Sequence, residues 1–193
     1  MQLDRQTLSG VESFVLRALD RPARSALELS GRPPWLTLAP ALAGLALVAL
    51  SCAFCEALVP AHSRLLGRLD VLRAALEALA VVAPSAVVLT TLLGLRAPPR
   101  LLIASFALAL FTAGVVAACL APLAAFLAVV SSSAPEVTLV PVLLLPGVTL
   151  AVHGAVTVRV LDALDGSPLA RGFGRAQAML LFAVFFALLR VLP

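Results

Sequence analysis

The feature that most constrains the fold is a nearly uninterrupted apolar run from Leu101 to Val158. Two features break it, namely the polar patch at residues 131–136 and the lone ionisable side chain of His153. A transmembrane helix needs about 20 consecutive apolar residues, and no soluble domain of this size buries a run of this length. The run therefore predicts membrane spans joined by a very short outer turn.

The rest of the chain agrees with this reading. Of its 193 residues, 62% are hydrophobic and 12% are charged, whereas a soluble domain is about half apolar and about a quarter charged. We expect an all-α polytopic transmembrane bundle of about five spans, with no room for a separate soluble domain. A cytoplasmic amphipathic segment (residues 1–34) precedes the transmembrane domain (residues 35–193). The expected spans are 36–58, 76–95, 101–121, 137–158 and 176–191.

Residues Leu8 to Ser30 are predicted to form a surface-lying helical segment. Ser9 and Glu12 have the spacing of a capping box, and an apolar stripe with helical period follows. This stripe either lies in the lipid headgroup region or packs on the protein's own bundle, and Trp35 is a candidate interface anchor. The stripe comprises Val11, Phe14, Val15, Ala18 and Leu19, and the residues that fall away from it are Arg17, Asp20 and Arg21.

Prolines are expected to bend or break the longer spans. Pro84 lies inside the second span and is expected to kink it. The third apolar run continues past Pro122 and would measure about 45 Å as one helix. Pro122 is therefore expected to break it and to leave residues 123–130 as a kinked extension or a shallow interfacial turn. An amphipathic lead-in to the second span carries Arg73 and Glu77, which are four residues apart and close enough to pair.

The distribution of arginine predicts the orientation. All 14 basic residues are arginine, and ten fall in the segments that would lie inside if the N-terminus is cytoplasmic, against four outside. The positive-inside rule then favours a cytoplasmic N-terminus and an external C-terminus. A sixth crossing at 123–130 would move the C-terminus inside. The composition is typical of a bacterial protein, so we expect a multi-pass protein of the bacterial cytoplasmic membrane whose first span inserts uncleaved and which does not bind nucleic acid.

The basic amphipathic N-terminal stretch, the five closely spaced spans with tiny connections and the short C-terminal end resemble the bacterial members of the Yip (Ypt-interacting protein) family. The most similar part is Val156 to Phe185, with its polar loop at 161–172 and with Arg175 and Ala176 opening the last span. This resemblance implies an integral membrane adaptor or organiser that has no catalytic residues.

Three cysteines are candidates for chemistry. Cys52 and Cys55 form a C-x-x-C pair, the spacing at which one thiolate can be resolved by a second cysteine, and Cys119 is predicted at a similar depth. A membrane thiol relay competes with the simpler interpretation that the cysteines are small apolar packing residues. Cys52 and Cys55 with Glu56 and His62 could also supply metal ligands, although a structural zinc site needs four fixed ones.

His153 is the most distinctive single residue. An ionisable group at membrane depth marks a pathway or a relay by default, but a neutral imidazole can also form a structural hydrogen bond between helices. A haem would require a second axial histidine, and His62 is predicted to lie far away at the outer face. The candidate hydrogen-bond partners of His153 are Thr90, Thr91, Thr149 and Thr157.

A polar loop is expected between the last two spans, at residues 159–175. Asp162 and Asp165 could bind a cation there or could simply be solvated, and together with Arg171 and Arg175 they form a candidate partner-binding loop.

We find no nucleotide-binding loop, hydrolase triad or zinc-protease motif. The leading hypothesis is a non-enzymatic organiser, adaptor or accessory subunit without a cofactor or metal, acting on other membrane proteins or as a homo-oligomer. The first alternative is a small transporter or permease subunit with a pathway near His153 and the proline-interrupted fourth span. The second is a thiol relay through Cys52, Cys55 and Cys119.

Overall fold

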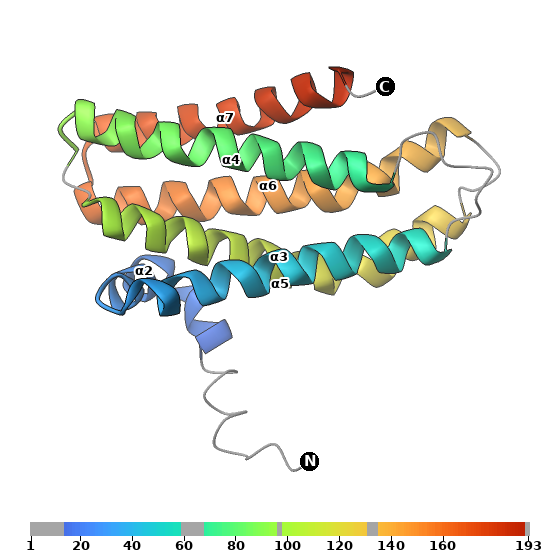
Figure 1. Ribbon diagram of the computed structural model, residues 1–193, viewed down its shortest axis with the longest axis horizontal. Helices are drawn as coiled ribbons and strands as arrows, with labels where there is room; N and C mark the ends of the chain where they lie inside the picture. Colours follow the sequence, from blue (N-terminus) through green and yellow to red (C-terminus); the bar gives the residue numbers. More distant parts are fainter. Residues whose placement is uncertain (1–13, 59–67, 96–97, 131–134, 192–193) are drawn as a thin grey trace, which may run out of the picture.

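The protein is described by a computed structural model that covers residues 14–58, 68–95, 98–130 and 135–191. Every regular element in this part of the chain is a helix (Figure 1). Residues 14–20 are helical and lead into six further helices. These are α2 (Pro22–Ser30), α3 (Pro34–Leu58), α4 (Arg68–Leu92), α5 (Pro99–Val130), α6 (Pro135–Asp165) and α7 (Pro168–Val191). Five of them begin with proline, whose fixed φ and missing N–H suit a first helical turn.

The five long helices lie side by side and alternate in direction (Figure 1). Contacts run in the order α3, α5, α6, α7 and α4, so that helices distant in sequence are neighbours. Helix α5 is central: 67% of its most apolar window is buried, against 22% for α3 and 28% for α7. The exposed sides of α3 and α7 carry large apolar residues such as Leu42, Leu50, Met179 and Phe186.

Among the described residues, three helices are long and apolar enough to cross a membrane. They include the windows Pro34–Cys55, Pro99–Leu127 and Pro168–Leu188, and each exceeds the roughly 20 residues that a span requires. Helix α4 contains a shorter apolar stretch, Leu76–Leu92. The all-α class is confirmed for the described residues, and the three apolar helices indicate a membrane protein.

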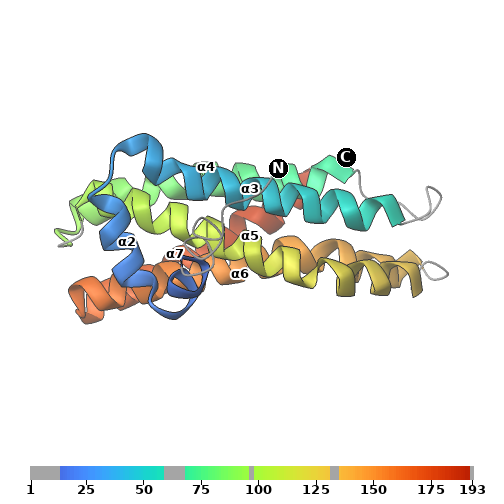
Figure 2. The ribbon, with the colours of Figure 1, turned by 90° about the horizontal axis from the view of Figure 1, so that it is seen from below.

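The segment ahead of the first long helix packs on the bundle. Ala18, Ala26 and Leu29 are buried in one cluster with residues of α5 and α6. The Phe14 and Phe111 rings lie 5.5 Å apart. Figure 2 shows α2 running across the long helices at one end of the molecule. Of the two interpretations of the predicted stripe, packing on the protein's own helices therefore describes Ala18 and the partly buried Phe14, whereas Leu19 is exposed. The earlier residues of the stripe lie outside the described part of the chain.

The prediction that Pro122 breaks the third span is wrong, and residues 123–130 extend the helix rather than form a shallow turn. Helix α5 continues through Pro122 to Val130 as one element of 32 residues, about 48 Å at 1.5 Å per residue. Ala121 on one side of this proline and Ala124 and Ala125 on the other are buried in one cluster with Val48 of α3. This packing holds the helix together where the local sequence favours a break. Pro84 likewise lies inside the continuous helix α4.

The predicted polar loop at 159–175 is also wrong. Only Gly166 and Ser167 are non-helical there, because α6 runs to Asp165 and α7 begins at Pro168. Gly166 has a φ of 61°, the left-handed conformation in which glycine commonly ends a helix. The Ser167 hydroxyl then accepts a hydrogen bond of 3.1 Å from the Ala170 amide, as an N-cap residue does. The sequence Gly-Ser-Pro is thus a complete stop and start signal between two helices.

Candidate functional site

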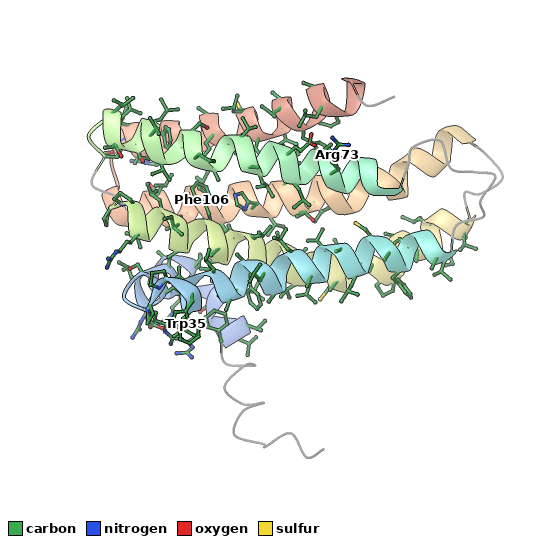
Figure 3. All side chains as sticks on the ribbon, viewed as in Figure 1. Trp35, Arg73 and Phe106 are labelled. Carbon is green, nitrogen blue, oxygen red and sulfur yellow. The ribbon has the colours of Figure 1, made fainter. Side chains whose placement is uncertain are left out.

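His153 lies within α6, with its side chain buried against neighbouring helices. Its imidazole stacks on the ring of Phe106 from α5, with ring centroids 5.7 Å apart and planes within 6° of parallel. Figure 3 marks Phe106 in the interior of the bundle, between the labelled residues Trp35 and Arg73. The predicted location of His153 deep among apolar helices is therefore observed.

A small cavity adjoins His153 at the meeting of α6, α7 and α4. Its volume is about 10 Å³, close to the minimum of roughly 10–15 Å³ that one water molecule occupies. Gly154 keeps the two helices close here, because a Cβ added to it would lie 2.9 Å from the Cβ of Ala178. The cavity is lined by Val82 of α4, by His153, Gly154 and Thr157 of α6, and by Gly174, Gln177, Ala178 and Leu181 of α7.

Two polar atoms around this cavity have no hydrogen-bond partner among the described residues. These are Nδ1 of His153 and Oε1 of Gln177, and both are buried. An unpaired buried polar atom costs about 1–3 kcal/mol, so each is a candidate for an interaction with a bound species. A protonated Nδ1 is a donor and Oε1 is an acceptor. A single water could therefore accept a hydrogen bond from Nδ1 and donate one to Oε1, whereas an organic substrate would not fit.

Three of the four threonines predicted near His153 bind carbonyls of their own helices. The Thr157 hydroxyl donates to the His153 carbonyl over 2.9 Å. Thr90 donates to the carbonyls of Ala86 and Val87, and Thr91 donates to that of Val87. Sequence analysis missed Gln177, although an amide in an apolar helix was a usable signal. Its spacing from Gly174 and Leu181 puts these three residues on one face of α7.

The cysteines divide between two sides of α5. Cys55 is buried between α3 and α5, and its thiol donates to the Ala121 carbonyl over 3.4 Å. Cys52 packs partly buried in the same cluster. Cys119 is exposed, because it is two residues from both Ala117 and Ala121 and so points away from α3. The structure therefore brings Cys52 and Cys55 to one cluster but does not bring Cys119 to it.

The proposed metal ligands are only partly described. His62 and the side chain of Glu56 lie outside the described residues. Within the described part of the chain, no three His, Cys, Asp or Glu side chains come together in a way that could hold a metal ion.

The residues of the candidate partner loop now lie on two helix ends. Asp162 of α6 forms an ion pair of 3.0 Å with Arg171 of α7, and both side chains are about half exposed. The Arg171 guanidinium also donates to the Gly166 carbonyl. Asp162 therefore has a cationic partner of its own. Arg175 is exposed on α7, and the side chain of Asp165 lies outside the described part of the molecule.

Charged side chains also gather on the outer face of the N-terminal helices. Arg21 pairs with Asp20 and Arg24 pairs with Glu28, each over 3.4 Å. With Arg17 they surround a shallow hollow of about 240 Å³. We call these five residues the α2 charged surface. Comparisons with protein-family models, with curated proteins and with solved structures found no match to this chain.

Proposed function

We propose that the protein is a non-enzymatic membrane organiser or adaptor that holds a partner protein on its α2 charged surface. The observation that carries this proposal is the arrangement of the N-terminal helices. Ala18, Ala26 and Leu29 are buried against α5 and α6, while the charged side chains face outward together with the exposed Leu16, Leu19 and Leu27. A charged surface held on a packed scaffold is preorganised, and preorganisation lowers the entropic cost of binding a partner.

The membrane topology of the proposal has five crossings. Helices α3, α5 and α7 all begin at the end of the bundle where α2 lies (Figure 1). If these three apolar helices cross the bilayer, the chain must return between them, and α4 and α6 are the return paths. The arginines of α2 and of the α5 and α7 starts then gather at one end, which supports a cytoplasmic N-terminus and an external C-terminus in a bacterial cytoplasmic membrane. The same topology underlies the proposed likeness to the bacterial Yip family.

Cysteine accessibility tests this topology. In a background in which all three native cysteines are replaced, Arg175→Cys should react with an impermeant maleimide only after the membrane is opened. Arg73→Cys, near the opposite end of the bundle, should react from outside in intact cells. The reverse pattern would contradict the proposed orientation, and labelling of both from one side would contradict five crossings.

Co-purification from the native membrane tests the adaptor function. We expect a stoichiometric protein partner to accompany the full-length protein in mild detergent, and the double variant Arg21→Glu/Arg24→Glu to lose it. The control Arg73→Gln, which changes an arginine near the other end of the bundle, should keep the partner. Absence of any stoichiometric partner, or its retention by the double variant, would contradict the proposal.

A transporter or permease subunit is the second candidate, and the unpaired atoms of His153 and Gln177 favour it. A proton is the probe to use, because the cavity beside His153 has room for no more than about one water molecule. Proteoliposomes with an entrapped pH-sensitive dye should then show a flux that His153→Ala abolishes. The adaptor proposal expects no such flux and expects His153→Ala to keep the partner, so the two functions separate.

A further inference from the structure

A second groove lies at the same end of the bundle, between the end of α2, the start of α3 and the start of α5. Its volume is about 370 Å³, within the range of small-ligand pockets. We infer that this groove binds one anionic phospholipid of the surrounding membrane. Two arginines hold the phosphate, and the apolar floor takes the upper part of an acyl chain. The lining residues that matter are Ser30, Arg32, Thr37, Leu38, Arg100 and Ile103.

The polarity of the groove changes along the helix axes as that of a phospholipid does. Arg32 precedes α3, and Arg100 is the second residue of α5. Ile103 lies about 4.5 Å further along α5 than Arg100, at 1.5 Å per residue. Leu38 lies in the second turn of α3 and, like Ile103, is exposed on the side of the bundle. Charge at the end of the helices and apolar surface one turn deeper match a headgroup and the start of its acyl chain.

The charges of the groove are complementary to a phosphate. None of its lining residues is acidic. Among the ion pairs of the described residues, Arg21, Arg24 and Arg171 have carboxylate partners. Neither Arg32 nor Arg100 takes part in them. A guanidinium offers donors in a planar fork that fits phosphate oxygens, so these two arginines are available to the ligand.

The hydroxyls of the groove are already engaged. Ser30 donates to the Leu27 carbonyl over 2.8 Å, and Thr37 donates to the Leu29 carbonyl over 3.1 Å. The Thr37 bond ties the start of α3 to the end of α2 and so fixes two walls of the groove relative to each other. Binding of the phosphate therefore depends on the two guanidiniums.

The position of Trp35 favours a lipid over a water-borne protein. Trp35 is exposed on the first turn of α3, beside Pro34 of the groove, and belongs to an apolar helix that can cross a membrane. Tryptophan is enriched at the level of the lipid headgroups. The groove thus opens at the depth where phospholipid phosphates lie.

The test uses Trp35 as the reporter, because it is the only tryptophan of the chain. The purified protein is placed in phosphatidylcholine vesicles that contain a small fraction of phosphatidylglycerol brominated on its acyl chains, or the same fraction of brominated phosphatidylcholine. Bromine quenches tryptophan fluorescence on contact. We expect stronger quenching by the anionic lipid. Since each guanidinium lost removes a charge-assisted hydrogen bond to the bound headgroup, Arg32→Gln and Arg100→Gln should each weaken the preference about tenfold or more.

Controls separate this site from a general attraction to the basic end. Arg159→Gln removes an exposed arginine on α6 outside the groove and should leave the preference unchanged. Arg32→Lys should retain part of it, and an unchanged thermal unfolding midpoint shows that each variant is folded. Equal quenching by the two lipids would overturn the inference, as would a preference that survives Arg32→Gln/Arg100→Gln. Loss of the preference on adding inorganic phosphate at constant ionic strength would assign the groove to free phosphate and overturn the lipid.

Discussion

The α3–α5 interface and the α6–α7 interface both bring helices close together through glycines, but, among the described residues, only the first is packed without a cavity. At the first, Gly44 and Gly114 bring two backbones into direct contact, and a Cβ added to Gly114 would lie 2.7 Å from the Cα of Gly44. Alanines and Cys55 fill the rest of this interface. At the second, glycines also allow a close approach, but they leave a cavity beside two buried polar atoms without partners.

The difference shows that the α6–α7 interface contains a feature that lowers stability and that packing does not explain. Small residues at a helix crossing let dispersion contacts and shape complementarity hold helices together in lipid, where the hydrophobic effect does not. The α3–α5 interface is explained fully in these terms. The α6–α7 interface is not, because a leucine or methionine in place of Gln177 would remove an unpaired atom. A residue that lowers stability and improves no packing contact is a candidate functional position.

The largest expected effect comes from crowding the α3–α5 interface. Gly114→Ala should destabilise the protein by about 1–3 kcal/mol, because the added methyl group meets the backbone of Gly44 and the helices must separate. The matched control is Gly172→Ala on α7, where an added Cβ meets nothing within 4 Å; it should be neutral or gain up to about 1 kcal/mol from helix propensity. Denaturant unfolding in detergent measures both, and equal effects would show that the close crossing is not a stabilising contact.

The next largest effect is an increase in stability, on replacement of Gln177. Gln177→Met keeps the side-chain length and removes the unpaired Oε1, so it should stabilise the protein by about 1 kcal/mol or more. Gln177→Asn keeps an amide and enlarges the cavity, so it should destabilise it. The same unfolding assay compares the two variants. Destabilisation by Gln177→Met would mean that a tightly bound water or another ligand already satisfies the amide in the membrane.

These two interfaces also show what could be read from the sequence. The apolar runs predicted the helical class and the membrane character. The spacing of four residues predicted the Arg73–Glu77 pair, which is observed at 2.7 Å. Each of these depends on local periodicity. The closest contacts could not be predicted in the same way. Gly44 meets Gly114 because α3 crosses α5 at one particular register, and no spacing within either helix encodes that register.

The two wrong predictions have a common cause. Pro122 was expected to break its helix, and the segment 159–175 was expected to be a loop. Both interpretations relied on local polarity and helix propensity and left out contacts with other helices. Packing across α5 overrides the proline. The connection carries a turn signal in Gly166, Ser167 and Pro168. The prediction extended the loop well beyond these residues, to 159–175. His153 was found from its isolation, whereas Gln177 was overlooked because an amide is less conspicuous than an ionisable group.

A smaller effect distinguishes the cysteines of the α3–α5 interface from Cys119. Cys55→Ala should cost about 1 kcal/mol, since it removes a buried atom and its contact with the Ala121 carbonyl, whereas Cys119→Ala should stay within about 0.5 kcal/mol. A membrane-permeant maleimide should modify Cys119 in the folded protein and Cys55 only on unfolding. Formation of a disulfide between Cys119 and either Cys52 or Cys55 under mild oxidation would contradict this arrangement and restore the thiol relay as a hypothesis.

The smallest effect is expected where α6 and α7 are joined. Asp162 and Arg171 are half exposed, and pairs of this kind contribute about 0.2–1 kcal/mol, less at high salt. A double-mutant cycle with Asp162→Asn and Arg171→Gln should therefore give a coupling energy in this range that vanishes as salt is added. The Arg73–Glu77 pair on α4 is the matched control, because it is similarly exposed but spans one helix turn. A coupling of several kcal/mol would mean that the charged connection holds α6 and α7 together. A small coupling would mean that buried residues further along the interface, such as Leu150, Leu181 and Phe185, hold the two helices together. The unpaired atoms of His153 and Gln177 would then be the destabilising feature among the described residues of this interface.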